Sequence, residues 1–182
     1  MSDPEVIRTY LRTQAAICFS LLYSRYSQKI YSKCIAILKD ETLAQDAMQE
    51  IFTKIFLNLS KFGGKSKFST WVYSVTYNFC IDYIRRHKKE SSIFSDEMEK
   101  AADFIEEVDD RELLSMEIQQ LKQVLEIIPA TDKAILLMKY QEEMSIREIA
   151  DALDKTESAV KMKIKRAKAK AKLIKDDLPP IS

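Results

Sequence analysis

The sequence is poor in glycine, proline and histidine. Its 182 residues include two glycines, adjacent at Gly63 and Gly64, four prolines and one histidine. Two adjacent glycines cannot form a glycine-rich phosphate loop or a nucleophile elbow, which excludes the enzymes built on those motifs. So few glycines and prolines leave few tight turns, and this favours a chain that is nearly all helical. The lone His87 excludes a multi-histidine metal site and argues against a Ser-His-Asp triad.

Cysteines and long apolar runs are also scarce. The three cysteines, Cys18, Cys34 and Cys80, form no Cys-x-x-Cys pair and have apolar neighbours. We therefore expect buried thiols in a reducing cytoplasm. The longest apolar run, residues 15–23, is too short for a bilayer span, which takes about 20 residues. The N-terminus lacks the basic and apolar regions of a signal peptide, so we expect a soluble, cytoplasmic protein.

Charge, by contrast, is abundant and unevenly distributed. The net charge is +1, but residues 1–90 carry +6, residues 91–128 carry −8 and residues 129–182 carry +3. Within the last block, residues 155–175 hold nine basic side chains and one acidic side chain. A solvated helix face ordinarily explains one such run. Two basic ends around an acidic segment favour a polyanionic partner instead.

Hydrophobic periodicity predicts two helical domains. We expect the first over residues 1–90, an acidic linker over 91–112 and the second over 113–182. Residues 6–38 fit two helices of the first domain, and a third helix follows. The predicted fold class is all-α, with two small helical domains joined by the acidic linker and a helix-turn-helix in the second domain.

The third helix has the clearest pattern. Thr42 and Gln45 fit a capping box at its start. Apolar side chains then recur at helical spacing along one face, at Ala44, Ala47, Met48, Ile51, Phe52, Ile55 and Phe56. The opposite face is polar, and plain solvation is one explanation of it.

A turn-rich segment, residues 61–70, precedes another helix. Trp71 and Asn78 lie on one stripe of this helix, and a basic segment, residues 85–89, follows it. The core side is expected to hold Val72, Val75, Phe79 and Tyr83. Aromatic rings among lysines and arginines suit single-stranded nucleic acid, whose bases stack and whose phosphates need cations. Core packing is the alternative explanation of Trp71.

The second domain contains a helix, a short turn and a basic helix. Ser145 and Glu148 fit a capping box, and Thr156 can cap the following helix. The inward positions of that last helix are Val160, Ile164, Ala167, Ala171 and Ile174. This order is typical of a helix-turn-helix, whose second helix enters the DNA major groove. A plain helical hairpin shares the apolar pattern, but the positive charge of the last helix favours DNA binding.

Three segments carry a family resemblance: AQDAMQEIFTKIF (44–56), KFSTWVYSVTYNFCIDYIRRHKK (67–89) and IIPATDKAILLMKYQEEMSIREIADALDKTESAVKMKIKRAKAKAK (127–172). In this order and at these distances they resemble the extracytoplasmic-function (ECF) sigma factors of bacterial RNA polymerase. The resemblance implies a subunit that binds core polymerase and directs promoter recognition, strand opening and transcription initiation. It implies no catalytic residue, metal, cofactor or small-molecule substrate.

The resemblance also implies residue roles. The clamp helices of the largest polymerase subunit would be bound by Asp46, Gln49, Glu50 and Lys54. The −10 promoter element, with a base flipped from the melted strand, would be bound by Lys61, Lys65, Lys67, Ser69, Trp71, Tyr73, Asn78, Arg85, Arg86 and Lys88. The −35 element would meet Ser158, Lys161, Met162, Lys163, Lys165 and Arg166.

The family further implies an inhibitory partner, commonly a membrane-anchored anti-sigma factor. The sequence departs from the family at Asp154, where glycine is usual in the turn, but aspartate tolerates a left-handed backbone. A free-standing helix-turn-helix regulator is the alternative function, although it leaves Trp71 and Asn78 unexplained. The acidic linker is also expected to shield the basic helix, through Asp103, Glu106, Glu107, Asp109 and Asp110.

Overall fold

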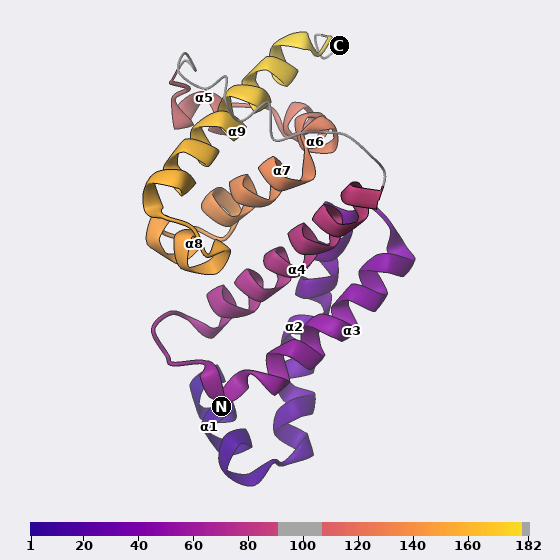
Figure 1. Cartoon of the computed structure of the whole chain (residues 1–182), viewed down its shortest axis with the longest axis vertical. Coiled ribbons are helices and arrows are strands. Elements are labelled where there is room, and N and C mark those ends of the chain that lie inside the picture. Colours follow the sequence, from indigo (N-terminus) through magenta and orange to yellow (C-terminus); the bar gives the residue numbers. More distant parts are fainter. Residues whose placement is uncertain (91–106, 180–182) are drawn as a thin grey trace. The chain divides into compact units, whose positions relative to one another are not determined.

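The computed structural model describes residues 1–90 and 107–179, with all their side chains except those of residues 88–90. The described residues form helices and turns and contain no strand, which confirms the predicted all-α class. The chain divides into two compact units, Met1–Arg85 and Arg86–Ser182 (Figure 1). Each unit is described by itself below.

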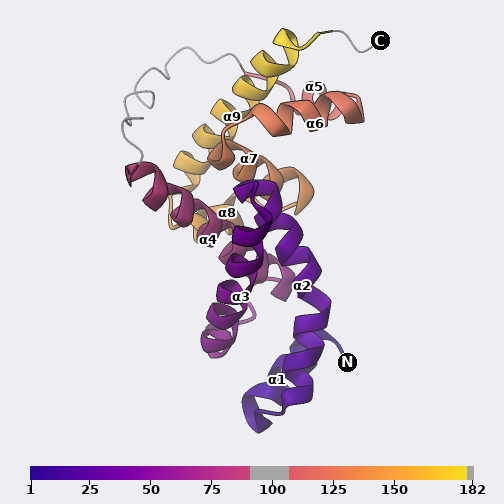
Figure 2. The ribbon, with the colours of Figure 1, turned by 90° about the vertical axis from the view of Figure 1, so that its right-hand side faces the viewer.

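The first unit is built around a long central helix, α2, which packs against α1 and α3 (Figure 2). Its elements are α1 (Asp3–Thr13), α2 (Ala16–Leu38), α3 (Glu41–Leu57), a 3-10 turn η1 (Leu59–Lys61) and α4 (Phe68–Glu90). Arg25 of α2 donates hydrogen bonds to the Asp3 carboxylate at 2.5 Å and to the Met1 carbonyl at 2.7 Å. These bonds hold the start of α1 against α2.

The N-terminus of α3 differs from the sequence prediction. Asp40, and not Thr42, is the capping residue: its carboxylate accepts a hydrogen bond from the Leu43 N–H at 2.8 Å. Asp40 has an extended backbone, which suits the cap position, and aspartate is at least as good a cap as threonine. The predicted apolar face is correct at Ala44, Ala47, Ile51, Phe52 and Ile55, which are buried, whereas Met48 and Phe56 are only half-buried.

The buried face of α4 also differs in part from the expected one. Val72 and Phe79 are buried as predicted, but Val75 and Tyr83 are only half-buried. Thr76, Tyr77, Cys80 and Ile81 are buried in addition. Thr76 tolerates burial because its hydroxyl donates a hydrogen bond to the Val72 carbonyl at 2.9 Å, which satisfies the polar group within the helix.

The three cysteines are buried free thiols, as the sequence predicts. Cys34 of α2 and Cys80 of α4 are fully buried and touch, with their sulfurs 3.9 Å apart. The hydrogen bond to Cys34, together with burial, raises the pKa of the Cys80 thiol far above its ordinary value. The thiolate is the reactive form, so this pair is expected to be chemically inert.

Iodoacetamide at mildly alkaline pH is expected to leave all three thiols unmodified in the folded protein and to alkylate all three in denaturant. Burial excludes the reagent, and the raised pKa of Cys80 keeps that thiol protonated. Intact-protein mass spectrometry measures the number of adducts. Rapid alkylation of Cys34 or Cys80 without unfolding would contradict the packing of α4 on α2.

The second unit surrounds the last helix, α9, which packs against α5, α6, α7 and α8. Its elements are α5 (Asp110–Leu114), α6 (Ile118–Ile127), α7 (Ala130–Leu136), a π-helical turn η3 (Leu137–Gln141), α8 (Ile146–Leu153) and α9 (Glu157–Asp177). Four of the five inward positions predicted for α9 are buried, and Ile174 is half-buried. Of the expected linker, residues 91–106 lie outside the described residues, whereas Val108 is buried in this unit.

Candidate nucleic-acid interface

A helix-turn-helix is formed by α8 and α9. The predicted capping box is present at α8, where Ser145 and Glu148 exchange hydrogen bonds of 2.9 and 3.1 Å. Asp154 ends α8 in the left-handed conformation, with φ of 51°, as expected of aspartate in this turn. Thr156 then accepts a hydrogen bond from the Ala159 N–H at 3.2 Å and caps α9. Local side chains thus fix both sides of the turn.

The first two turns of α9 present polar and basic side chains. Ser158, Lys161 and Met162 are exposed, and Lys165 is half-buried. Their spacing of three and four residues places these side chains on one face of the helix. Lys163 and Arg166, both half-buried, complete the predicted −35 set. A helix with such a face can read base edges while flanking lysines and arginines hold phosphates.

The second half of α9 uses its lysines differently. Lys168 donates hydrogen bonds of 2.7 Å to the Asp110 carboxylate and to the Val108 carbonyl. Further lysine–carboxylate pairs include Lys170–Asp132 at 2.6 Å and Lys172–Glu112 at 3.3 Å. Hydrogen bonds from Lys168 and Tyr140 lower the pKa of Asp110. These three lysines are therefore committed to α5 and α7, and the basic surface of α9 is shorter than its sequence indicates.

The acidic residues predicted to shield α9 differ in their contacts, where the structure describes them. Asp110 pairs with Lys168, and Asp109 caps α5 by accepting from the Arg111 N–H at 2.9 Å. Glu107 is exposed, while Asp103 and Glu106 lie outside the described residues. Within the described part of this segment, the ion pairs fall on the second half of α9 and not on its first two turns.

In the first unit, α3 carries a polar face. Asp46, Gln49, Glu50 and Lys54, the four residues predicted to bind polymerase, are all exposed. Their spacing places them along one side of the helix, opposite the buried face. The Lys54 ammonium lies 4.6 Å from the centre of the Phe79 ring of α4. This cation–π contact fixes one end of the polar face.

A groove that the sequence prediction missed lies beside this polar face. It has a volume of about 350 Å³ and is lined by Phe19, Tyr23, Gln49, Phe52, Thr53, Phe56 and Leu57. The Phe19 and Phe56 rings are tilted against each other with centres 4.2 Å apart, and the ring centres of Tyr23 and Phe52 are 4.6 Å apart. The spacing of Phe19 and Tyr23 on one side of α2 was the available signal. Gln49 belongs both to the groove and to the polar face.

An aromatic cluster joins the connecting loop to the start of α4. Phe62, Phe68 and Trp71 lie mutually in contact, with ring centres 5.3–5.7 Å apart. Phe68 is buried, and Trp71 is half-buried. Trp71 is the fourth residue of α4 and not its first, because the helix begins at Phe68. The core-packing explanation of Trp71 is thus correct in part, since its ring contacts Phe62 and Phe68, and its role in nucleic-acid binding stays a prediction.

The other residues predicted for the −10 element are distributed over the loop and along α4, down to its basic end. Lys61, Lys65 and Lys67 are exposed in or beside the loop. Gly64 gives the loop a left-handed residue, with φ of 67°, at no steric cost. Half-buried positions follow at Ser69, Tyr73 and Asn78, and exposed ones at Arg85 and Arg86. The side chain of Lys88 lies outside the described residues.

Two cationic residues of this surface were missed by the sequence prediction. Lys33 of α2 has its ammonium 4.2 Å from the centre of the Tyr73 ring, and that of Lys29 lies 5.5 Å from the Tyr26 ring. The signal that could have found them is the spacing of Arg25, Lys29 and Lys33 at every fourth residue of α2. No acidic residue occurs in α2.

Two further observations on the described residues concern metal binding and membrane spanning. Across residues 1–90 and 107–179, no cluster of three or more His, Cys, Asp or Glu side chains is arranged to hold a metal ion. None of the helices described there is both long and apolar enough to span a bilayer.

The helix-turn-helix of the second unit, with its exposed basic face, has the architecture typical of DNA-binding domains. Comparison with known families then identifies the family to which the chain belongs. Sigma-70 region 2 matches residues 22–90, and sigma-70 region 4 matches residues 118–170. The two matches together cover about two thirds of the chain. The chain belongs to the sigma-70 family, and its resemblance to the ECF group is confirmed by the relatives described next.

Two curated relatives are ECF RNA polymerase sigma factors of Bacillus subtilis (strain 168). SigM is 35% identical over 75 residues, which cover 41% of this chain and 45% of SigM. SigW is 37% identical over 70 residues, which cover 38% of this chain and 37% of SigW. The matches therefore span less than half the length of either relative.

Two solved structures share the fold. The sigma factor RpoE of Bartonella quintana, in complex with the anti-sigma factor NepR, matches with a TM-score of 0.60 and 16% identity. That match covers 87% of this chain and 97% of RpoE. CnrH, in complex with the cytosolic domain of CnrY, has a TM-score of 0.53 and 19% identity, covering 97% of this chain and 99% of CnrH. Identities this low support the fold alone.

Proposed function

We propose that this chain is a promoter-specificity subunit of bacterial RNA polymerase. It binds core polymerase and directs promoter recognition, strand opening and transcription initiation. The observation that carries the proposal is that one chain contains two different surfaces with the residue types that suit nucleic acid. One is a helix-turn-helix suited to duplex DNA, and the other is an aromatic cluster among lysines and arginines, suited to an unpaired strand.

The division of labour follows the predicted domains. Residues 1–90 bind core polymerase and the −10 element, residues 91–112 connect the domains, and residues 113–182 bind the −35 element. In the second domain, Ser158, Lys161, Met162 and Lys165 face bases, and Lys163 and Arg166 contact phosphates. Exposure of the first two turns of α9 supports these roles.

In the first domain, the exposed polar face of α3 binds the clamp helices of the largest polymerase subunit. The loop and the start of α4 capture a base flipped out of the melted strand, with Trp71 and Tyr73 stacking and Asn78 nearby. Arg85, Arg86 and Lys88 hold adjacent phosphates. The accessible portion of the Trp71 ring beside three exposed loop lysines supports this assignment.

The proposed subunit acts in the cytoplasm, supplies recognition and not chemistry, and needs no cofactor or small-molecule substrate. Its proposed inhibitory partner is an anti-sigma factor. The anti-sigma factors of this family are commonly anchored in the membrane. The structures of RpoE with NepR and of CnrH with CnrY support this partner by analogy of fold.

Core dependence of DNA binding tests the proposal. The purified chain is mixed with duplex fragments of its own genome, with and without core polymerase, and retained fragments are sequenced. We expect specific retention only when core polymerase is present. Specific duplex binding by the chain alone, unchanged by polymerase, would overturn the proposal and favour a free-standing helix-turn-helix regulator.

The two halves of α9 are expected to respond differently to loss of a lysine. Lys163→Ala removes a phosphate contact, so it is expected to reduce the slope of log affinity against log salt by about one unit. Lys168→Ala is expected to leave that slope unchanged. It should instead lower the free energy of unfolding by about 1–2 kcal/mol, because Lys168 makes two charge-assisted hydrogen bonds within the unit. Holoenzyme binding at several salt concentrations and chemical unfolding give the two readouts. Equal slopes for both variants would contradict the assignment of Lys163 to phosphate contact and of Lys168 to ion pairing within the unit.

A further inference from the structure

The roles proposed above for polymerase and promoter binding do not include a stripe of basic residues on α2. Arg25, Lys29 and Lys33 occur at every fourth residue, so they lie along one side of the helix. No acidic residue occurs within α2 to neutralise them. Arg25 is engaged by Asp3 and the Met1 carbonyl. Lys29 is exposed and Lys33 is half-buried.

The two lysines adjoin the aromatic surface of α4. The Lys33 ammonium lies 4.2 Å from the Tyr73 ring centre. The Lys29 ammonium lies 5.5 Å from the Tyr26 ring centre, and Tyr26 meets Phe68 edge-on at 5.4 Å. Phe68 in turn contacts Trp71 at 5.7 Å. Lys33 therefore contacts one of the rings proposed to capture a flipped base, and Lys29 is linked to the other through the buried rings of Tyr26 and Phe68.

A cation–π contact does not exhaust the bonding capacity of a lysine. The ammonium group carries three N–H donors, and attraction to a ring face leaves donors able to bind an anion. Proteins that hold unpaired strands combine stacking rings with cations that follow the phosphates. Lysines from a second helix beside Tyr73 and Trp71 provide such an arrangement.

We propose that Lys29 and Lys33 bind phosphates of the unpaired DNA strand whose bases are captured by Trp71 and Tyr73. Lys33 also positions the Tyr73 ring. The strand path thus extends from the loop and α4 onto α2, beyond the residues that the family resemblance assigns. This inference rests on the proposed function.

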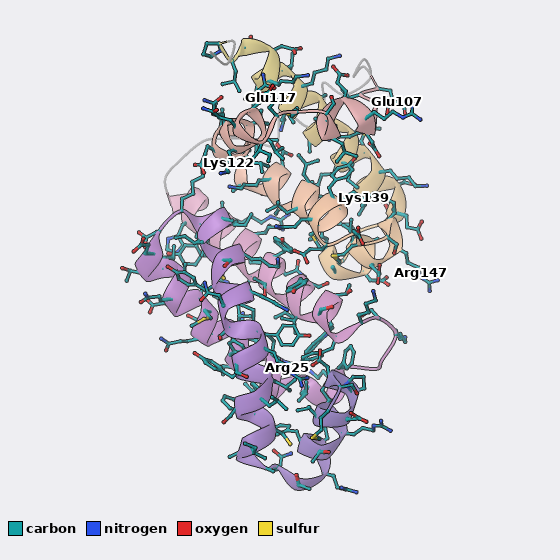
Figure 3. All side chains as sticks on the ribbon, turned by 180° about the vertical axis from the view of Figure 1, so that it is seen from behind. Arg25, Glu107, Glu117, Lys122, Lys139 and Arg147 are labelled. Carbon is teal, nitrogen blue, oxygen red and sulfur yellow. The ribbon has the colours of Figure 1, made fainter. Side chains whose placement is uncertain are left out.

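Salt dependence of binding tests the inference in the holoenzyme. The main probe is a fork, built on a promoter found by run-off transcription, in which the −10 segment of the non-template strand is unpaired. The second probe is a fully paired fragment carrying only the −35 element. Lys29→Gln, Lys33→Gln and the double variant are compared with the wild type. Lys122→Gln, on the exposed side of α6, is the matched control (Figure 3).

Each single variant is expected to reduce the slope of log affinity against log salt on the fork by about 0.7, and the double variant by about 1.4. The slope on the −35 fragment is expected to stay unchanged, as is the fork slope of Lys122→Gln. Lys33→Arg retains the cation and is expected to restore the slope. A role limited to packing against Tyr73 would alter affinity without altering the slope.

An unchanged fork slope in the double variant, with intact core binding and an unchanged unfolding midpoint, would overturn the inference alone. A wild-type holoenzyme that fails to bind the fork would overturn the proposed function as well. The two failures are therefore distinguishable.

Discussion

Trp71→Ala is expected to reduce promoter opening by about 5- to 150-fold, since stacking of one base on an aromatic ring contributes about 1–3 kcal/mol. The ring of Trp71 contacts Phe62 and Phe68, and the residue is half-buried. Alanine removes the accessible surface on which a flipped base would stack. Permanganate reactivity of unpaired thymines in the holoenzyme–promoter complex measures the opening.

Trp71 also packs within its own unit, so a loss of opening needs a control for folding. Trp71→Phe keeps a ring in the cluster and is expected to retain most of the opening. Affinity for core polymerase and the unfolding midpoint identify any variant that is merely unfolded. Normal opening by a folded Trp71→Ala variant would show that this ring serves packing only.

Glu50→Lys is expected to weaken binding to core polymerase by about thirtyfold or more, the effect of losing a hot spot worth about 2 kcal/mol. Glu50 is exposed at the middle of the polar face of α3, so reversal of its charge leaves the buried face intact. Fluorescence anisotropy of the labelled chain, titrated with core polymerase, measures the affinity.

Glu41→Lys is the matched charge reversal on the same helix. Glu41 is exposed in the first turn of α3, and about 100° per residue places it on a different side from Glu50. It is expected to retain near-normal affinity for core polymerase. If both variants weaken binding equally, net charge and not the polar face determines docking.

The sequence was informative wherever local chemistry determines structure. Capping residues and apolar spacing predicted α8, its turn and α9, because Ser145 and Thr156 bond to N–H groups within three residues. The same kind of signal failed at α3, where the sequence predicted Thr42 as the cap and Asp40, two residues earlier, holds that position. Basic residues beside aromatic ones predicted a site for unpaired nucleic acid, and that assignment stays a prediction.

Contacts between distant residues could not be predicted from spacing. Lys168 meets Asp110 across 58 positions of the sequence, so a run of basic residues gave no sign that part of α9 is neutralised. The buried face of α4 depends likewise on its neighbours, since Cys80 contacts Cys34 of α2. Lys33 and Tyr73 meet for the same reason, through the packing of α4 against α2.

Run-off transcription tests the central claim most directly. The purified chain and core polymerase from the same organism are mixed on fragmented genomic DNA, and transcript starts are sequenced. We predict discrete starts that share two upstream motifs and disappear when the chain is omitted. Absence of initiation by an active core polymerase, together with specific duplex binding by the chain alone, would contradict the account.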